Sequence, residues 1–382
     1  MMQTYGRAAV SDLIGDHVVY RNLVPQAPGL PGLGELRGPL DIPPGETPRK
    51  TSLDYARVMA HILGIARARQ VPGGVIRRVV FIGDTRLNDA TAFANICRAG
   101  EWPGRAFIGA EKPEPLRYEI ESLEVGAVYN ANRWSALGDF ALYLEDQDFP
   151  VDEGTAVLLD LDKTTLGARG RNDRTIDQAR VAAAFTTARQ SLGDDFDDQV
   201  FETAYHRLNQ VAFHSFTADN QDYLVYICLI LSGGLYTLPD LVGEIRAGRI
   251  SGFQPFIQAV EHQSAGLKPD LRAVHQQVYA RVRLGDPTPF KAFRENEYRE
   301  TVARLGHMPP GTPVEDLLAN EIVLTQEVRA QALAWQRNGA LLFGLSDKPD
   351  EASLPTPGLA SQGSLPIHRI TTSVVGDSLP DA

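Results

Sequence analysis

The feature that most constrains the fold is an apolar run that ends in two acids. Residues 156–165 read AVLLDLDKTT. The apolar part predicts a strand buried on both faces, as in a parallel sheet. Side chains two residues apart on an extended chain point the same way, so Asp160 and Asp162 would crowd one point at the strand's end. Such crowding of carboxylates is unfavourable unless a cation or a reaction requires it.

Two other apolar runs also end in polar residues, VVFIGDTRLND at 79–89 and LLFGLSDKP at 341–349. Alternating strand and helix patterns around them predict an α/β fold with a parallel, doubly wound sheet. Ligands of such sheets bind beyond the carboxyl ends of the strands, so residues from all three runs are expected to converge on one cleft. The carboxylates of Asp84, Asp89 and Asp160 would suit a hard cation such as Mg²⁺.

The bulk composition narrows the class of protein. The chain has 382 residues, 43% hydrophobic, with a formal net charge of −11. That charge argues against binding to nucleic acid or to an acidic membrane surface, but it allows a small anionic substrate in a local positive pocket. Two cysteines, Cys97 and Cys228, are too few for a disulfide framework. With no secretory pattern at the start and no run long enough to span a membrane, we expect a cytoplasmic protein.

The pattern changes along the chain and predicts two compact parts. Residues 1–49, dense in Pro and Gly between 24 and 48, are expected to be irregular. Residues 50–173 and 336–382 would form the α/β core, with one possible strand in the tail at 367–376. Helical periodicity dominates 174–335, which we interpret as an all-helical insertion.

The three runs, taken together, resemble the haloacid dehalogenase superfamily of aspartate-based phosphohydrolases. DLDKT is similar to its first motif, an apolar strand followed by Asp-x-Asp-x-Thr. GDTRLND is similar to its acidic fourth motif, and LLFGLS to its second motif, a strand that ends in Ser or Thr. The third motif is a lysine at the start of the helix before the fourth, where Lys50 stands. The resemblance covers residues 50–165 and 338–350.

The order of the motifs departs from that family. The family order is first, second, third, fourth, whereas this chain has third, fourth, first, second. The difference is a circular permutation, with the chain opened between the second and third motifs. It is physically permissible if the chain ends lie close together, as domain termini often do. The helical insertion follows the first motif, where the family places a cap domain.

The resemblance implies a role for each matched residue. Asp160 would be the nucleophile that forms an aspartyl-phosphate, and Asp162 the general acid and then the general base. Mg²⁺ would be held by the Asp160 carboxylate, the Asp162 backbone carbonyl and Asp84, with Asp89 as a further ligand or a hydrogen-bond acceptor behind it. Ser346 would bind a phosphoryl oxygen.

Lys50 would stabilise charge on the nucleophile and the phosphate. Lys348 is a rival for that role. Taken alone, Ser346 favours a turn cap over a phosphoryl ligand, because Ser commonly follows strands, and either Asn88 or Asp89 could cap the helix that follows.

These features predict a Mg²⁺-dependent phosphatase whose helical cap closes over a small phosphorylated metabolite. One alternative is a phosphotransferase on the same core, in which another acceptor replaces water. A second is a non-catalytic binding or scaffold protein whose helical part is the working surface.

Overall fold

A computed structural model describes residues 2–45 and 47–379, and its chain divides into two compact units. The first, here called the α/β unit, contains the residues up to Gln178 and those from Thr301 onward. The second, the helical unit, is Ala179–Glu300. Each unit has its own hydrophobic core.

A seven-stranded sheet forms the centre of the α/β unit, in the order β2-β9-β7-β3-β4-β6-β5. All neighbours are parallel except β5, which runs antiparallel to β6 at one edge. The strands are β2 (Val18–Val19), β3 (Arg78–Gly83), β4 (Gly104–Gly109), β5 (Tyr118–Leu123), β6 (Gly126–Ala131), β7 (Thr155–Asp160) and β9 (Leu341–Leu345). This confirms the predicted α/β fold with a mostly parallel sheet.

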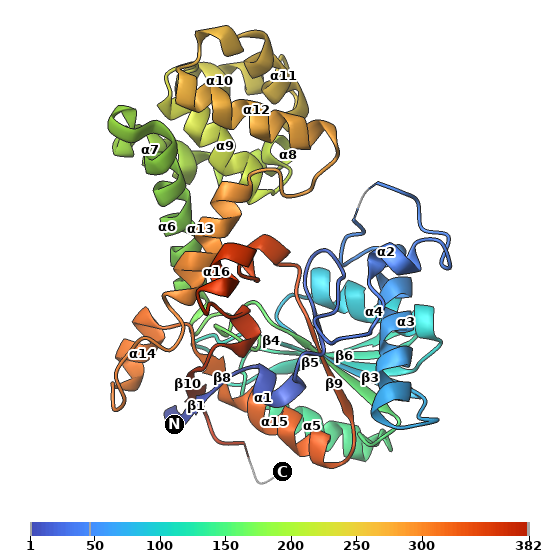
Figure 1. Ribbon diagram of the computed structural model, residues 1–382. Helices are drawn as coiled ribbons and strands as arrows, with labels where there is room; N and C mark the ends of the chain where they lie inside the picture. Colours follow the sequence, from blue (N-terminus) through green and yellow to red (C-terminus); the bar gives the residue numbers. More distant parts are fainter. Residues whose placement is uncertain (1, 46, 380–382) are drawn as a thin grey trace. The chain divides into compact units, whose positions relative to one another are not determined.

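Helices cover both faces of this sheet (Figure 1). On one face, α3 (Leu53–Gln70) and α4 (Asn88–Gly100) pack together against alternate strand residues such as Phe81 and Leu158. On the other face lie α5 (Ala136–Asp146) and α15 (Gln326–Arg337). Central strands such as β7 are buried along their whole length, which explains why their sequence is continuously apolar rather than alternating.

A second, three-stranded sheet joins the two ends of the chain. β1 (Gln3–Ala8) pairs antiparallel with β10 (Thr372–Gly376), which pairs in parallel with β8 (Leu324–Thr325). β10 lies within the strand expected at 367–376. The first 49 residues are less irregular than predicted, because they also contain α1 (Ser11–Ile14), β2 and α2 (Leu33–Leu36). Their partners are distant in sequence, so local patterns do not indicate them.

The helical unit is built around α9 (Gln221–Ser232), whose residues Leu224–Leu231 are all buried. Asn220 caps this helix by accepting a hydrogen bond from the Asp222 backbone N–H. The remaining helices of the unit are α6 (Asp173–Leu192), α7 (Asp198–Leu208), α8 (His214–Thr217), α10 (Leu238–Arg246), α11 (Phe253–His262), α12 (Pro269–Arg283) and α13 (Lys291–Val302). The terminal turns of α6 and α13 belong to the α/β unit.

The helical unit is shorter than the predicted helical part, 174–335. Residues 301–335, which include α14 (Val314–Asn320), β8 and α15, belong to the α/β unit. A helix that packs on a sheet and a helix in a bundle have the same amphipathic pattern. Periodicity alone could therefore not assign α15 to one unit or the other.

Across the described residues, no helix combines the length and the apolar character required to span a lipid bilayer.

Candidate metal and phosphoryl-transfer site

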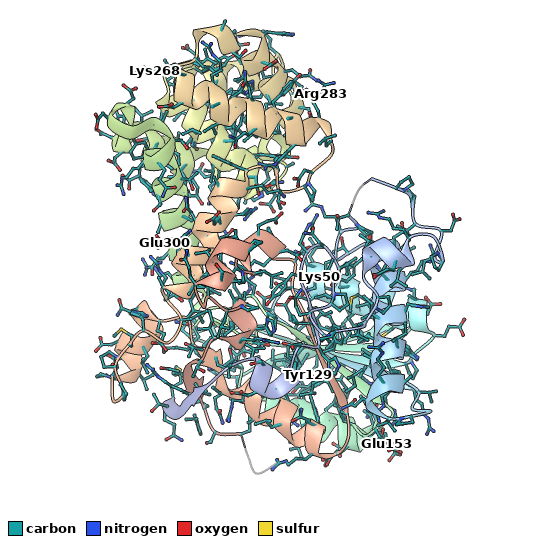
Figure 2. All side chains as sticks on the ribbon, viewed as in Figure 1. Lys50, Tyr129, Glu153, Lys268, Arg283 and Glu300 are labelled. Carbon is teal, nitrogen blue, oxygen red and sulfur yellow. The ribbon has the colours of Figure 1, made fainter. Side chains whose placement is uncertain are left out.

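The three polar strand ends meet at one edge of the seven-stranded sheet. Leu159 of β7 is paired with Ile82 of β3, and Asp160 is paired with Leu345 of β9. The residues that follow these positions therefore emerge side by side. Figure 2 shows Lys50 at this end of the sheet and Glu153, which precedes β7, at the opposite end.

Three carboxylates gather at this edge, from Asp84, Asp89 and Asp160. One oxygen from each lies within 4.8 Å of the others, and all three residues are buried. Within the described part of the chain, no other group of three or more His, Cys, Asp or Glu residues is close enough to hold a metal ion. The predicted convergence of Asp84, Asp89 and Asp160 is thus present in the structure.

Lys50 lies between two of these acids. Its Nζ donates to Asp89 Oδ1 at 2.7 Å and to Asp160 Oδ1 at 2.5 Å, and the residue is 5% exposed. Burial acts to lower the pKa of Lys50, but Asp160 and Asp89 outweigh it and raise the pKa well above the usual value. Of the two candidate lysines, Lys50 is the one that is hydrogen-bonded to Asp160.

Asp89 holds the turn between β3 and α4 in place. Its Oδ2 accepts from the backbone N–H groups of Asp84 and Thr85 and from the Thr85 hydroxyl. Burial alone would raise the pKa of Asp89, but Lys50 and the hydrogen bond from the Thr85 backbone lower it to about 2. Asp89 lies in the first turn of α4, and its side chain folds back over the turn to fix the position of Asp84.

Arg169, which the sequence analysis did not single out, lies against Asp84. Its Nε donates to Asp84 Oδ2. Burial and repulsion from Asp89 raise the pKa of Asp84 to about 7, although the Arg169 guanidinium acts in the opposite direction. Arg169 comes from the irregular loop between β7 and α6, where no periodicity indicates the direction of a side chain.

Asp160 has one oxygen engaged and one available. Oδ1 accepts from Lys50, whereas none of the described residues donates to Oδ2. Its backbone carbonyl accepts from both the N–H and the hydroxyl of Thr165, which turns the chain back sharply after the strand. Burial raises the pKa of Asp160 well above the usual range, and Asp89 and Asp84 add to the effect while Lys50 opposes it.

Asp162 and Ser346 lie just after the ends of β7 and β9. Asp162 is half-buried in the turn after β7, where it forms a bridge with Leu166. Ser346 is buried at the end of β9, and its hydroxyl oxygen accepts a hydrogen bond from the Lys348 backbone N–H. The hydroxyl therefore caps a turn, as the alternative interpretation held, and its own proton stays available for a ligand.

Arg21 is a second residue at this edge that the sequence analysis missed. It follows β2, is 5% exposed, and donates from Nη1 to Asp347, the residue after Ser346. The two-residue strand β2 is too short to leave a pattern in the sequence.

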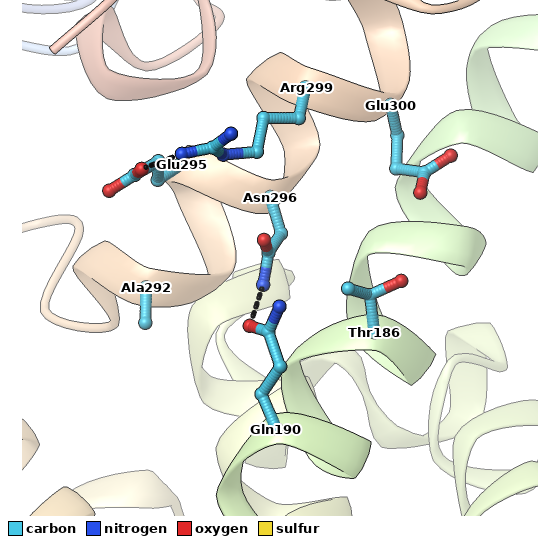
Figure 3. Close-up of a pocket in the computed structure, with 7 residues that line it drawn as sticks. All are labelled: Thr186, Gln190, Ala292, Glu295, Asn296, Arg299 and Glu300. Carbon is cyan, nitrogen blue, oxygen red and sulfur yellow. Dashed lines mark hydrogen bonds and ion pairs between the residues drawn. The ribbon is translucent and has the colours of Figure 1, made fainter. Parts of the chain in front are cut away.

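The helical unit contains a separate cavity of about 290 Å³ (Figure 3). Its lining comes from α6 and α13 and consists of Thr186, Gln190, Ala292, Glu295, Asn296, Arg299 and Glu300. The Asn296 amide donates to Gln190 Oε1 and to the Thr187 hydroxyl, and Arg299 pairs with Glu295. The polar groups thus bond largely to one another, as in a surface hollow between two helices.

The donor set at the strand ends fits a hard divalent cation. All three groups offer carboxylate oxygens, the ligands that Mg²⁺ and Ca²⁺ prefer, and no sulfur or imidazole lies among them. Three acids and two cations, Lys50 and Arg169, leave one excess negative charge when all are ionised. A bound cation would offset the burial and the mutual repulsion that raise the pKa values of Asp84 and Asp160.

No model of a known protein family matches this chain, and neither the curated proteins nor the solved structures yield a match. We therefore infer function from the geometry of the site and from the motif resemblance.

Proposed function

We propose that this protein is a Mg²⁺-dependent phosphohydrolase that acts through an aspartyl-phosphate on Asp160. The observation that carries the proposal is the buried group of Asp160, Asp89 and Asp84 with Lys50 bonded to the first two. A carboxylate with one oxygen held by a lysine and the other available suits nucleophilic attack.

The proposal includes a haloacid dehalogenase-like core in permuted order. Its support is that residues matching the first, third and fourth motifs, far apart and reordered in sequence, contact one another in space. The pairing of β1 with β10 supplies the closeness of chain ends that a permutation requires. The new chain ends produced by the permutation would then lie in the second sheet, where β1 and β10 pair.

Asp84 and Asp160 would hold the metal, together with the backbone carbonyl of Asp162. Bound there, the ion would neutralise charge so that an anionic nucleophile can approach an anionic phosphate. Asp89 would fix Asp84 through the hydrogen bonds of the β3–α4 turn.

In the first half of the reaction, Oδ2 of Asp160 attacks the phosphorus of a phosphate monoester. A bond forms between Asp160 and phosphorus while the bond to the leaving alcohol oxygen breaks. Asp162 gives its proton to that oxygen, so the product leaves as a neutral alcohol. Lys50 and the Ser346 hydroxyl stabilise the negative charge that the phosphoryl oxygens carry during transfer.

In the second half, Asp162, now a carboxylate, takes a proton from a water molecule. The resulting hydroxide attacks phosphorus, the bond to Asp160 breaks, and inorganic phosphate leaves. Both carboxyl groups are then in their starting states, so the cycle closes without any further reactant.

The helical unit would serve as a cap that determines which alcohol is accepted. It is inserted shortly after Asp160, and both of its connections to the α/β unit run through helices, α6 and α13. A cap that closes over the substrate would exclude water during the first half-reaction. The net charge of −11 makes a small anionic metabolite a better substrate than a nucleic acid.

The test is phosphate release from p-nitrophenyl phosphate with and without MgCl2. We expect Mg²⁺-dependent activity that Asp160→Asn abolishes while the circular dichroism spectrum is retained. Asp198→Asn, which changes an exposed acid on α7, is the matched control and is expected to keep full activity.

An acid-quenched reaction followed by peptide mass spectrometry should find one phosphoryl group on the peptide that contains Asp160. Undiminished activity in Asp160→Asn would refute the proposal.

A further inference from the structure

The Arg169 backbone is anchored at three points. Its N–H donates to the Lys163 carbonyl, and its carbonyl accepts from the Glu111 N–H and from the Trp134 indole N–H. Glu111 follows β4 and Trp134 follows β6, so the loop after Asp160 is fixed across the ends of these two strands, beyond β3. An arginine on such a loop has a defined position without using its own side chain to hold it.

Among the charged side chains at this site, that of Arg169 is the exposed one. It is 36% exposed, whereas the Asp84 side chain that it contacts is 5% exposed. Only Nε is engaged, by Asp84 Oδ2; among the described residues, no oxygen accepts from its two terminal amino groups. Burial acts to lower the pKa of Arg169, but Asp84 outweighs it, so the guanidinium stays charged.

Arg171, two residues further on, shows what a purely structural arginine looks like in this loop. Both of its terminal amino groups donate to Glu327, one of them also to Glu111, and its side chain is 2% exposed. The two arginines therefore differ in whether their terminal amino groups are bonded to described residues of the protein. Arg171 uses its fork inside the protein, whereas the Arg169 side chain is partly exposed and none of the described residues accepts from its fork.

The sheet order places these groups in a row. Asp160 ends β7, Asp84 follows β3, and the Arg169 backbone is bonded to Glu111 at the end of β4, and these three strands are consecutive. A substrate whose phosphoryl group is at Asp160 would reach Arg169 only with a part that extends past Asp84. Paired with a carboxylate, a guanidinium fork forms two parallel charge-assisted hydrogen bonds.

We propose that Arg169 binds a second anionic group of the substrate, a carboxylate, so that the enzyme acts on phosphate monoesters of small hydroxy acids. This inference rests on the proposed function of the same site. A carboxylate fits better than a second phosphate, because Asp84 already offsets part of the Arg169 charge and Asp173 lies within electrostatic range. A carboxylate brings one negative charge, which these two acids repel less than the nearly two charges of a phosphate monoester.

The experiment compares 3-phosphoglycerate with glycerol 3-phosphate, which carries an alcohol where the first has a carboxylate. The readout is the ratio of kcat/KM for the two esters, measured as phosphate release. We expect the wild-type ratio to favour 3-phosphoglycerate and to fall about 10- to 100-fold in Arg169→Ala, mainly through KM, since a lost charged hydrogen-bond pair has that effect. Arg169→Lys should restore part of the ratio.

Arg86→Ala is the matched control. Arg86 is in the β3–α4 loop, its side chain is 67% exposed, and it pairs with Glu121 at the surface. We expect it to leave the ratio unchanged. An unchanged ratio in Arg169→Ala, with both esters losing equally, would mean that Arg169 acts only through Asp84, and it would overturn the inference without touching the proposed function.

Binding to the Asp160→Asn protein separates the two proposals. Calorimetry of that protein with each ester should show tighter binding of 3-phosphoglycerate, and the added Arg169→Ala change should remove the difference. If wild type releases phosphate neither from these esters nor from p-nitrophenyl phosphate but this binding difference is present, the inference stands and the hydrolytic function fails. Equal binding of the two esters overturns the inference.

Discussion

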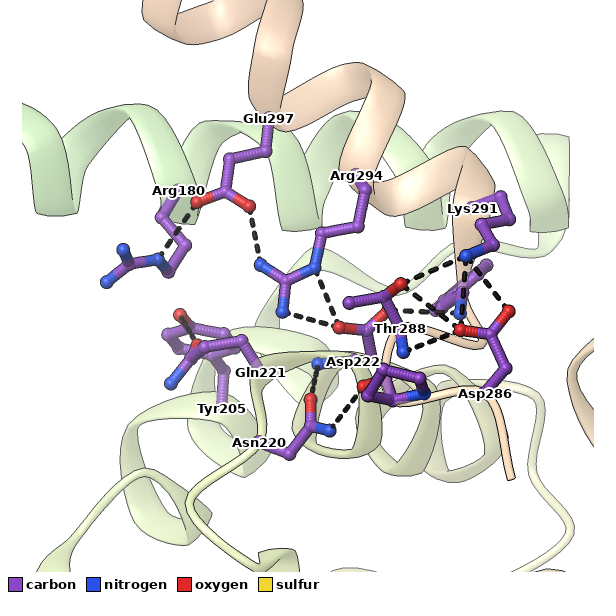
Figure 4. A network of polar contacts seen from close by, with 12 residues as sticks. Arg180, Tyr205, Asn220, Gln221, Asp222, Asp286, Thr288, Lys291, Arg294 and Glu297 are labelled. Atoms are coloured by element: carbon purple, nitrogen blue, oxygen red, sulfur yellow. Dashed lines mark hydrogen bonds and ion pairs between the residues drawn. The ribbon is translucent and has the colours of Figure 1, made fainter. Parts of the chain in front are cut away.

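The two units each bury a group of charged side chains, and the two groups are built differently. In the helical unit, Asp222 accepts from Arg294 and from the Phe290 backbone N–H, while Glu297 accepts from Arg294 and Arg180 (Figure 4). These two acids and two arginines carry no net charge. The group joins α6, α9 and α13, elements that are far apart in sequence.

The charged group at the strand ends of the α/β unit also combines acids with cations, but here the acids outnumber the cations. Three acids, Asp84, Asp89 and Asp160, face two cations, Lys50 and Arg169. One of the cations is partly exposed, and no donor among the described residues reaches Oδ2 of Asp160. A balanced group serves stability and specificity of packing, whereas an excess of one sign in a buried place indicates a missing counter-charge.

The largest expected difference appears when one acid in each group is made neutral. Asp222→Asn would leave two arginines, Arg294 and Arg180, facing the single acid Glu297, so one buried positive charge would be uncompensated. We expect a loss of about 3–5 kcal/mol in the free energy of unfolding of the helical unit. Asp160→Asn removes one of the crowded charges, so the α/β unit should be as stable as wild type or more stable.

The unfolding of the two units can be measured separately. All three tryptophans, Trp102, Trp134 and Trp335, lie in the α/β unit, so tryptophan fluorescence in urea follows that unit alone. Hydrogen exchange of α9 by mass spectrometry follows the helical unit. A similar loss of stability in both variants would show that the two groups are equivalent, against this account.

We expect Mg²⁺ to stabilise the α/β unit and to leave the stability of the helical unit unchanged. A ligand that binds the folded state at 100 times its Kd stabilises it by about 2.7 kcal/mol. With MgCl2 at that level, the fluorescence transition of the α/β unit should move to higher urea, while the exchange rates of α9 stay the same. Asp84→Asn should abolish the shift. A shift that survives in this variant would place the ion elsewhere.

The smallest expected effect is a difference between the two units in how their stability depends on pH. Burial raises the pKa of Asp84 to about 7 and that of Asp222 to about 6, in each case despite the arginine partner. An acid whose pKa is higher in the folded state contributes stability that is full below its unfolded pKa and is lost as pH rises to the folded pKa.

Between pH 6 and pH 7 the α/β unit should therefore still lose stability, at up to about 1.4 kcal/mol per pH unit, while the Asp222 contribution in the helical unit has levelled off. Urea titrations by fluorescence at several pH values measure the first slope, and Asp84→Asn should remove the part of it that Asp84 contributes. An unchanged slope in that variant would show that Asp84 does not titrate there.

The meeting of Asp84, Asp89 and Asp160 could be predicted from the sequence, because parallel strands must bring their carboxyl ends to one edge. Lys50 could be proposed only through the motif resemblance, since a lysine before a helix has no distinctive pattern of its own. Its contact with both Asp160 and Asp89 was visible only in space.

Other features could not be predicted, for identifiable reasons. Arg169 reaches Asp84 from an irregular loop, where side-chain direction follows from tertiary hydrogen bonds rather than from periodicity. β1 and β2 pair with strands more than 300 residues away, so their short sequences carry little local information. The helix α15 has the same amphipathic character whether it packs on a sheet or in a bundle.

The central claim is that the excess of acid at the strand ends forms a divalent-cation site. Its most direct test is a calorimetric titration of the full chain with MgCl2 at pH 8, where Asp84 is ionised, alongside Asp84→Asn and the surface control Asp198→Asn. We expect one Mg²⁺ site per chain in wild type and in the control, and no binding in Asp84→Asn. Equal binding in all three proteins, or no binding in any of them, would contradict it.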